Sequence, residues 1–238
     1  MERSHSILRN AYEEIKTMEN NKFTPLDLQS WSRGQMFYYF TQMAPTGFSL
    51  TATLDITIMK KALEERQFKF FPAFVWAVTT ILNQHMEFKI AIKEEVLGYW
   101  NTLTPLYPTF HEDNKTISQI WTPYSSVFKD FYSGYLDNEK EYGDHRGVLA
   151  QPVSSLPANC YSVSCLPWID FQHFSLHSYE NKPYYFPTIE GGKFTANGDK
   201  VTMPISISVH HATTDGWHVK CFLEELQALM NEPLTWLD

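Results

Sequence analysis

The richest concentration of reactive side chains is the segment His210-His211-Ala212-Thr213-Thr214-Asp215-Gly216, which holds two imidazoles and a carboxylate within seven residues. A neutral imidazole accepts a proton from a hydroxyl near pH 7, so a histidine here is a candidate general base. The residues before it alternate, so a strand would place His211 on the face of the apolar residues and His210 with the serines. We therefore expect His211 to be the buried imidazole, kept neutral by its burial.

Other interpretations of this segment remain open. A histidine on an apolar strand face is about as often a core residue bonded to a neighbour. Asp215 comes just before a predicted helix, so it has three possible roles: capping that helix, orienting a histidine or pairing with an arginine. Zinc binding by the histidine pair with Asp215 and His218 is disfavoured, because adjacent strand residues point to opposite faces. We expect no metal.

Several other kinds of chemistry are disfavoured by the sequence. There is no Gly-x-Ser-x-Gly nucleophile elbow and no dinucleotide-binding glycine fingerprint. Residues 191–194, Gly-Gly-Lys-Phe, lack the upstream glycine and the Ser or Thr of a phosphate loop. The formal charge of -8 argues against nucleic-acid binding, which needs a basic face.

Composition is that of a globular domain with a ring-rich core, since 43% of the 238 residues are hydrophobic and 16% aromatic. We predict one domain at residues 23–238, preceded by a helical extension at residues 1–22. Three cysteines cannot all pair, which favours a reducing cytoplasm. No secretory leader and no run of about 18 apolar residues is apparent, so no membrane partner is expected.

The elements that must position the histidines alternate between strands and helices. Residues 48–58 have strand periodicity and residues 59–63 turn toward helix. Residues 71–86 are apolar nearly all round, which predicts a buried helix, with Pro72 in its first turn. Short strands follow between residues 90 and 121, interrupted by Pro105 and Pro108.

The second half of the chain supplies the remaining elements. Residues 124–142 have weak helical periodicity, and residues 160–166 alternate as a strand does. Residues 193–209 are typical of a hairpin that turns at Asn197-Gly198. From Gly216 onward apolar residues recur at helical spacing. This mixture predicts an α/β or α+β fold in which helices cover a mixed sheet in a two-layer sandwich.

The segment from His210 to Gly216 matches the His-His-x-x-x-Asp-Gly motif of the CoA-dependent acyltransferases. Further segments resemble the chloramphenicol acetyltransferases, in their order and near their spacing: Trp31-Ser32-Arg33, Gly47-Phe48-Ser49-Leu50-Thr51, Asp55-Ile56-Thr57, Pro123-Tyr124-Ser125-Ser126 and Leu166-Pro167-Trp168. The resemblance runs from about residue 23 to the C-terminus. It implies a homotrimer with active sites between subunits, and acetylation of a chloramphenicol hydroxyl by acetyl-CoA.

The resemblance also implies roles for individual residues. His211 would be the general base and Ser164 the donor to the tetrahedral oxyanion, while Arg33 and Asp215 would form a buried ion pair behind the histidine. Acetyl-CoA would lie along one set of residues: Trp168, Phe194, Lys69 and Lys193. The acceptor would contact another set: Tyr39, Phe40, Thr46, Phe48 and Glu190.

Two of these positions depart from the family pattern. The chain has Tyr39-Phe40 where a Phe-Tyr pair is usual, so a tyrosine hydroxyl for the antibiotic is displaced or lost. Glu190 stands where a threonine is usual, and a carboxylate there would alter polarity and the pKa of His211. An O-acetyltransferase of the same fold acting on another alcohol is therefore the alternative. A non-catalytic trimeric binding protein is a further one, disfavoured by the intact His211, Ser164, Arg33 and Asp215.

Overall fold

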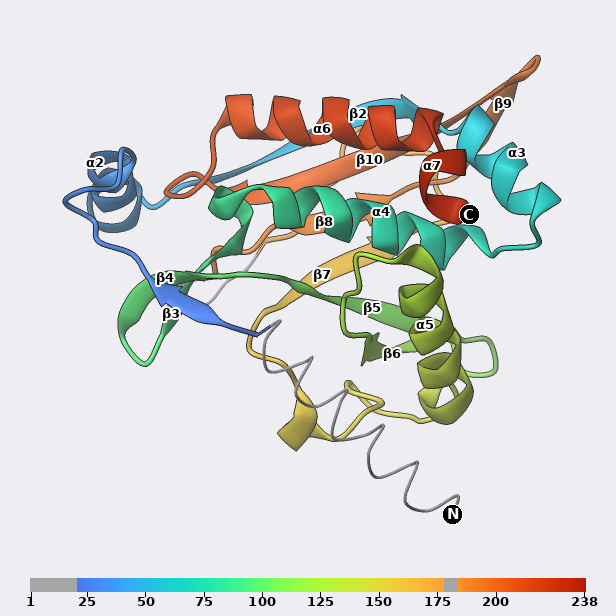
Figure 1. Cartoon of the computed structure of the whole chain (residues 1–238), viewed down its shortest axis with the longest axis horizontal. Coiled ribbons are helices and arrows are strands. Elements are labelled where there is room, and N and C mark those ends of the chain that lie inside the picture. Colours follow the sequence, from blue (N-terminus) through green and yellow to red (C-terminus); the bar gives the residue numbers. More distant parts are fainter. Residues whose placement is uncertain (1–20, 178–183) are drawn as a thin grey trace.

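The computed structural model describes residues 21–177 and 184–238, and a mixed sheet with helices over one face dominates it (Figure 1). The strand order is β2 (Gly47–Asp55), β10 (Lys200–His210), β8 (Thr188–Gly191), β7 (Cys160–Cys165), β5 (Thr104–His111) and β6 (Thr116–Trp121), with β9 (Thr195–Asn197) on β10. Strand β7 is parallel to both of its neighbours, and the other pairs are antiparallel. A small antiparallel sheet joins β1 (Phe23–Pro25), β4 (Val96–Trp100) and β3 (Ile90–Lys93).

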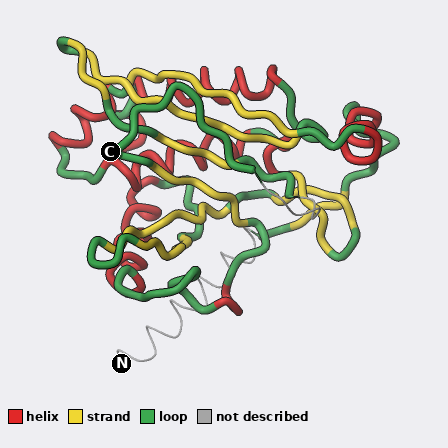
Figure 2. Tube along the Cα trace, turned by 180° about the vertical axis from the view of Figure 1, so that it is seen from behind, coloured by secondary structure: helices red, strands yellow, loops and turns green. Residues whose placement is uncertain are grey.

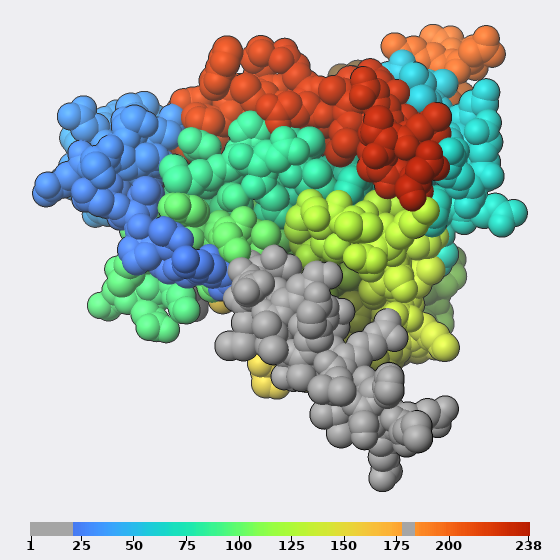
Figure 3. Space-filling view, in the orientation of Figure 1, coloured from blue at the N-terminus to red at the C-terminus, as the bar shows by residue number. Residues whose placement is uncertain are grey.

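The helices form the second layer. They are α3 (Thr57–Glu65), α4 (Phe70–Gln84), α5 (Phe128–Tyr142) and α6 (Gly216–Asn231), with the short α2 (Gly34–Tyr38) and α7 (Leu234–Leu237). Single turns of other kinds lie at Tyr39–Met43, Met86–Lys89 and Val153–Ser155. Seen from the helical side, α4 is flanked by α5 and α6 (Figure 3). This arrangement confirms the predicted helix-covered mixed sheet.

Helix α4 is the centre of the core, as its sequence predicts. Its residues from Pro72 to Thr79 are all buried, with Phe74 and Val78 at 0% exposure. A helix needs no N–H partners in its first turn, so Pro72 at the third position does not disturb it. Because α4 contacts α5, α6 and strand β5, each side of the helix buries apolar surface.

The face of the sheet opposite the helices is polar. Ile189, Val163 and Ile205 point into the helix-covered core at 0% exposure, so the alternate residues of the same strands point the other way. We call these alternate residues the polar face: Ser49 and Thr51 of β2, Ser206 and Ser208 of β10, Thr188 and Glu190 of β8, and Ser162 and Ser164 of β7.

The chain after β7 runs across the polar face, as the view from behind shows (Figure 2). The Phe174 carbonyl accepts a hydrogen bond of 2.7 Å from the Ser206 hydroxyl, and the Phe174 N–H donates to Thr51 Oγ1 at 3.4 Å. These bonds hold the described part of this segment, up to residue 177, against β2 and β10.

The structure corrects two local predictions. Pro105 and Pro108 do not separate strands, because both lie inside β5. Pro105 pairs only with β7 and Pro108 only with β6, so each has one neighbour and its missing N–H interrupts no ladder. The hairpin before His210 is confirmed, but its two loop residues are Gly198, at φ +60°, and Asp199, one position later than predicted.

The predicted N-terminal helix, and all but the end of the predicted extension at residues 1–22, lie outside the described residues. Within the described ranges, no helix combines the length and apolar character needed to cross a bilayer.

Candidate active site

His211 lies directly beyond β10, which ends at His210, and two hydrogen bonds position it. Its backbone N–H donates to the Thr46 carbonyl at 2.9 Å, which ties it to the chain entering β2. Its Nδ1 lies 3.0 Å from the Thr214 carbonyl oxygen. A carbonyl only accepts hydrogen bonds, so this contact places the proton of the neutral ring on Nδ1 and leaves the lone pair on Nε2.

Two aromatic rings hold the imidazole in place. Phe40 stacks on it with ring centroids 4.0 Å apart and an interplanar angle of 23°, and Phe48 meets it edge-on at 5.1 Å. His211 is half-buried. Within the described part of the chain, no hydrogen bond to Nε2 is found, and a neutral imidazole held in this way has the geometry of a general base.

An ion pair lies behind the turn that carries His211. Arg33 Nη1 is 2.5 Å from Asp215 Oδ2, and Arg33 Nη2 donates to the His211 carbonyl at 3.3 Å. Burial alone would raise the pKa of Asp215, but the hydrogen bond from Arg33 and the positive charges of His218 and Arg33 lower it overall. Asp215 also caps α6, because its Oδ1 accepts the Trp217 N–H at 3.0 Å. Two of the roles left open for Asp215, capping and pairing with an arginine, are therefore found together.

The expected contrast between the two histidines is wrong, because His210 is half-buried as well. Its ring packs edge-on against Tyr185 at 4.9 Å, and its Nδ1 accepts the Ala212 N–H at 3.1 Å. Burial, reinforced by the adjacent His211, lowers the pKa of His210. Strand alternation places a side chain on a face but does not show what covers that face, and here Tyr185 covers it.

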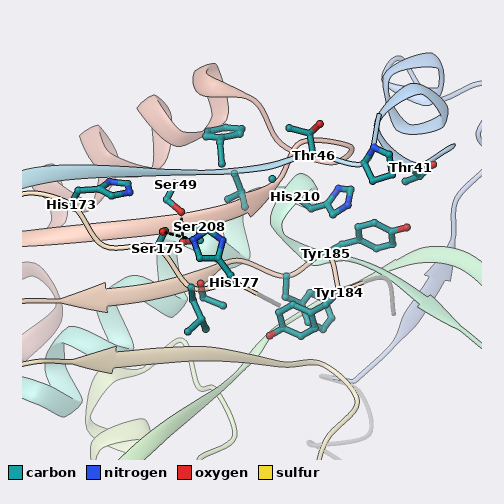
Figure 4. Close-up of a pocket in the computed structure, with 17 residues that line it drawn as sticks. Thr41, Thr46, Ser49, His173, Ser175, His177, Tyr184, Tyr185, Ser208 and His210 are labelled. Atoms are coloured by element: carbon teal, nitrogen blue, oxygen red, sulfur yellow. Dashed lines mark hydrogen bonds between the residues drawn. The ribbon is translucent and has the colours of Figure 1, made fainter. Parts of the chain in front are cut away.

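A cleft of about 1190 Å³ opens beside His210 (Figure 4). Its lining includes Thr46, Phe48, His173, Tyr184 and Tyr185. His211 and Ser164 are not among its lining residues. The cleft therefore runs along the polar face next to the turn that carries His211, without including His211 itself.

Two of the predicted acceptor residues, Phe40 and Phe48, contact the His211 ring, and Tyr39 packs behind Phe40. Tyr39 packs its ring edge-on against Phe40 at 5.0 Å and is itself 45% exposed. Thr46 Oγ1 donates to the Ala44 carbonyl at 2.7 Å, so this hydroxyl shapes the chain leading into β2. The turn at Tyr39–Met43 thus brings Tyr39 and Phe40 to the histidine.

Ser164 and Glu190 form a separate group. They are paired residues of the parallel strands β7 and β8, and the Ser164 hydroxyl hydrogen-bonds the Glu190 carboxyl group. Glu190 is buried at 7% exposure. Burial raises its pKa to about 7, although the hydrogen bond from Ser164 acts in the opposite direction.

Within one chain, the Ser164–Glu190 pair lies far from His211 and the rings around it. Ser206 is the β10 partner of Glu190 and precedes His211 by five residues, which at ~3.3 Å per residue separates them by about 17 Å. Ser164 lies two strands from β10, a further ~10 Å sideways. The two displacements are perpendicular, so His211 and Ser164 are about 19 Å apart.

Two of the predicted acetyl-CoA contacts are brought together by a backbone bond. The Lys193 N–H donates to the Ile169 carbonyl at 2.8 Å, one residue beyond Trp168. Trp168 is 61% exposed, and its ring meets that of Phe110 edge-on at a centroid distance of 5.1 Å. An exposed ring beside a lysine suits a flat, charged ligand.

The other two predicted acetyl-CoA contacts, Phe194 and Lys69, lie at the start of α4. Phe194 packs edge-on against Phe70 at 4.6 Å, and Lys69 is the preceding residue. The Lys69 ammonium already pairs with Glu139 at 2.7 Å. Lys193 is therefore the freer cation for a phosphate.

Some features of the site were missed by the sequence reasoning. The Thr214 carbonyl, which orients the imidazole, is a backbone group without a sequence signal. The stacking of Phe40 on His211 requires a contact across about 170 residues of sequence. No group of three or more His, Cys, Asp or Glu side chains able to hold a metal occurs in the part of the chain that the structure describes.

Comparison with known proteins yields consistent matches. The family model for chloramphenicol acetyltransferase matches residues 21–227. The chain is 37% identical to the chloramphenicol acetyltransferase of Clostridium butyricum over 91% of its own length and 98% of that protein's. It is 35% identical to chloramphenicol acetyltransferase 3 of Escherichia coli, over 89% of this chain and 99% of that protein.

Solved structures show the same fold. A chloramphenicol acetyltransferase structure superposes with a TM-score of 0.81 at 19% identity, covering 88% of this chain and 100% of that one. The dihydrolipoamide acetyltransferase of Azotobacter vinelandii gives a TM-score of 0.59 at 14% identity, over 86% of this chain and 89% of that one.

Proposed function

This chain belongs to the chloramphenicol acetyltransferase family, and from that premise we propose that it transfers the acetyl group of acetyl-CoA to a hydroxyl of chloramphenicol, with His211 as the general base. The observation that carries the proposal is the bond from His211 Nδ1 to the Thr214 carbonyl, 3.0 Å long. It leaves Nε2 as the proton acceptor on a ring that Phe40 and Phe48 already position.

The reaction needs one base and one oxyanion donor. Nε2 of His211 takes the proton of the acceptor hydroxyl as its oxygen attacks the thioester carbonyl carbon. The Ser164 hydroxyl donates a hydrogen bond to the oxyanion that develops on the carbonyl oxygen. The C–S bond then breaks, and the imidazolium returns its proton to the departing thiolate of CoA. No acyl-enzyme forms, and no metal takes part.

The site is completed by a second copy of the chain in a homotrimer. A carbonyl carbon within reach of both groups would need His211 and Ser164 about 6–8 Å apart, yet one chain separates them by about 19 Å. Exposed aromatic surface next to His211, including Tyr39 at 45% exposure, is available to a neighbouring subunit. A cyclic trimer in which His211 meets the Ser164 of the next subunit removes the discrepancy.

Mixing two inactive variants tests this arrangement. When His211→Ala and Ser164→Ala chains are unfolded together and reassembled in equal amounts, about one site in four receives both intact residues from different chains. Activity should return to about a quarter of the wild-type value. If each site used one chain only, the mixture would stay as inactive as its components.

Thiol release from acetyl-CoA in the presence of chloramphenicol tests the reaction itself. His211→Ala should lower kcat by about 10²–10⁴, the usual contribution of a general base. His210→Ala is the matched control, because it removes the adjacent imidazole, whose Nδ1 is occupied by the Ala212 N–H. Loss of activity in the control alone would reassign the base.

The second candidate is O-acetylation of a different alcohol by the same machinery. It is favoured by the buried carboxyl of Glu190 and by Phe40, whose ring stacks on His211 rather than presenting a hydroxyl. A panel of alcohols, assayed for CoA release beside chloramphenicol, separates the two candidate functions.

We also propose a cytoplasmic location, since Cys160, Cys165 and Cys221 are unpaired.

A further inference from the structure

Glu190 occupies the middle of the polar face, between Ser164 on β7 and Ser206 on β10. Its neighbour Ile189 points into the helix-covered core, so the Glu190 side chain points to the opposite side of the sheet. Only 7% of Glu190 is exposed. A carboxyl group is therefore buried beside the hydroxyl that is to bind the oxyanion.

No positive charge accompanies this carboxyl group. Among residues 21–177 and 184–238, Glu190 has no ion pair, and Ser164 is its side-chain hydrogen-bond partner. On β10 it faces Ser206, whose hydroxyl donates to the Phe174 carbonyl. The titratable group coupled to it on β7 is the Cys165 thiol, whose own pKa is raised by burial and by Glu190.

The described part of the segment that crosses the polar face adds three titratable groups: His173 and His177, which line the cleft, and Asp170, which accepts a bond from Thr195. None of the three forms an ion pair or a hydrogen bond with Glu190. A carboxyl group buried without a cation favours its neutral form. Accordingly, burial raises the pKa of Glu190 to about 7.

The protonation of Glu190 decides where the hydrogen of the Ser164 hydroxyl points. A serine hydroxyl has a single hydrogen to donate and two lone pairs to accept with. An ionised Glu190 can only accept, so it takes that hydrogen. A neutral Glu190 donates its own hydrogen to Ser164 Oγ, and the hydroxyl hydrogen is then free for another acceptor.

We propose that Glu190, held as a neutral carboxylic acid, is the positioning residue of the oxyanion donor: it donates to Ser164 Oγ and thereby turns the Ser164 hydrogen toward the thioester carbonyl oxygen. The inference rests on the proposed function of Ser164 and deepens it. Glu190 keeps its proton throughout the reaction, while His211 carries the proton of the acceptor. An ionised Glu190 takes the Ser164 hydrogen away from the oxyanion and places a negative charge beside it. For both reasons the enzyme with an ionised Glu190 is inactive.

The kinetic test compares the wild type with Glu190→Gln across pH, because the glutamine amide donates to Ser164 Oγ at every pH. Taking the ratio of the two kcat values cancels the effect of His211 protonation. The ratio should be near one below pH 7 and rise about tenfold per pH unit above it, to about 100 at pH 9. KM should change little, because the oxyanion exists only in the transition state.

Glu225→Gln is the matched control, since it makes the same change at a glutamate that pairs with His85 on the helical side. It should follow the wild-type pH profile. A wild-type rate that stays level to pH 9, or a Glu190→Gln variant that falls with it, would overturn the proposal. A merely structural role would lower kcat at all pH values alike.

A second measurement does not depend on turnover. Infrared difference spectra of the wild type against Glu190→Gln follow the protonated carboxyl band during a pH titration. We expect a midpoint near pH 7 that moves upward in Ser164→Ala, because the Ser164 hydrogen bond lowers this pKa. A midpoint near 4.5, or one unaffected by Ser164→Ala, refutes the inference. If both infrared results hold and chloramphenicol is not acetylated, the choice of acceptor is wrong and the Glu190–Ser164 unit stands.

Discussion

Replacing Asp215 by asparagine should destabilise the protein by separating an ion pair without removing a helix cap. Asp215 Oδ2 lies 2.5 Å from Arg33 Nη1, and the Arg33 side chain is only 11% exposed. Arg33 Nε is buried and has no hydrogen-bond partner among residues 21–177 and 184–238, so the guanidinium depends on its remaining contacts. In Asp215→Asn it keeps the bond from Nη2 to the His211 carbonyl and loses its counter-charge.

The loss of unfolding free energy in Asp215→Asn follows from the burial of Arg33 and Asp215. Breaking a fully buried ion pair costs about 3–5 kcal/mol. Asp215 is 34% exposed, so water screens part of the charge and about 2–3 kcal/mol is expected. Asparagine is a good N-cap and preserves the bond to the Trp217 N–H. Asp215→Ala removes that bond too and should cost about 1 kcal/mol more.

Urea and thermal unfolding measure these differences, and a loss of 2–3 kcal/mol lowers Tm by about 4–12 °C at this chain length. The fold lowers the pKa of Asp215, so its contribution is present above about pH 4 and disappears as pH falls through the folded pKa. Asp215→Asn should lack this acid dependence. Its kcat should fall about 10–100-fold, because the Thr214 carbonyl that orients His211 lies in the same turn.

Glu64→Gln provides the comparison, since it breaks an exposed pair with Lys60 on α3 and should change stability by less than about 0.5 kcal/mol. If Asp215→Asn is as stable as this control, the Arg33–Asp215 pair does not hold the turn that carries His211. Equal stability of the asparagine and alanine variants would show that capping of α6 contributes nothing.

Three further outcomes can be checked. Phe40→Ala removes the ring stacked on His211 and should lower kcat about tenfold or more with folding retained; an unchanged kcat would show that the stacking does not orient the base. Burial raises the pKa of Glu190 from 4.5 to about 7 in the folded protein. The wild type therefore has its full stability below pH 4.5 and loses stability as the pH rises to about 7. Glu190→Thr should therefore be more stable than the wild type by roughly 3 kcal/mol at pH 8 and equal to it near pH 4, in urea titrations at both values; equal stability at pH 8 would contradict the buried charge. Lys193→Ala should raise the KM for acetyl-CoA at low salt more than Lys69→Ala, whose ammonium is already paired, and the reverse order would exchange their roles.

Elements with strong periodicity were predictable from the sequence. The apolar run at residues 71–86 forms the buried α4, and the run after Gly216 forms α6, because both have enough apolar residues on the faces that the core covers. The hairpin before His210 was predictable as well, since Gly198 supplies the positive φ that its turn needs.

Features that depend on a neighbouring strand were not predictable. The two prolines of β5 are tolerated only because β6 and β7 pair with different parts of that strand. His210 is half-buried because Tyr185, 25 residues earlier, packs on its ring. Local sequence contains neither pairing partner.

The sequence by itself therefore determined the His-His-x-x-x-Asp-Gly motif, the family and the order of strands and helices, because each depends on residue types at short spacing. Only the tertiary structure decided which functional side chains lie next to one another. The mixed sheet places Ser164 beside Glu190, and the turn at Tyr39–Met43 places Phe40 on His211. The same sheet keeps His211 and Ser164 apart, because the strand order, which is set by long-range pairing, puts two strand spacings and five residues of β10 between them.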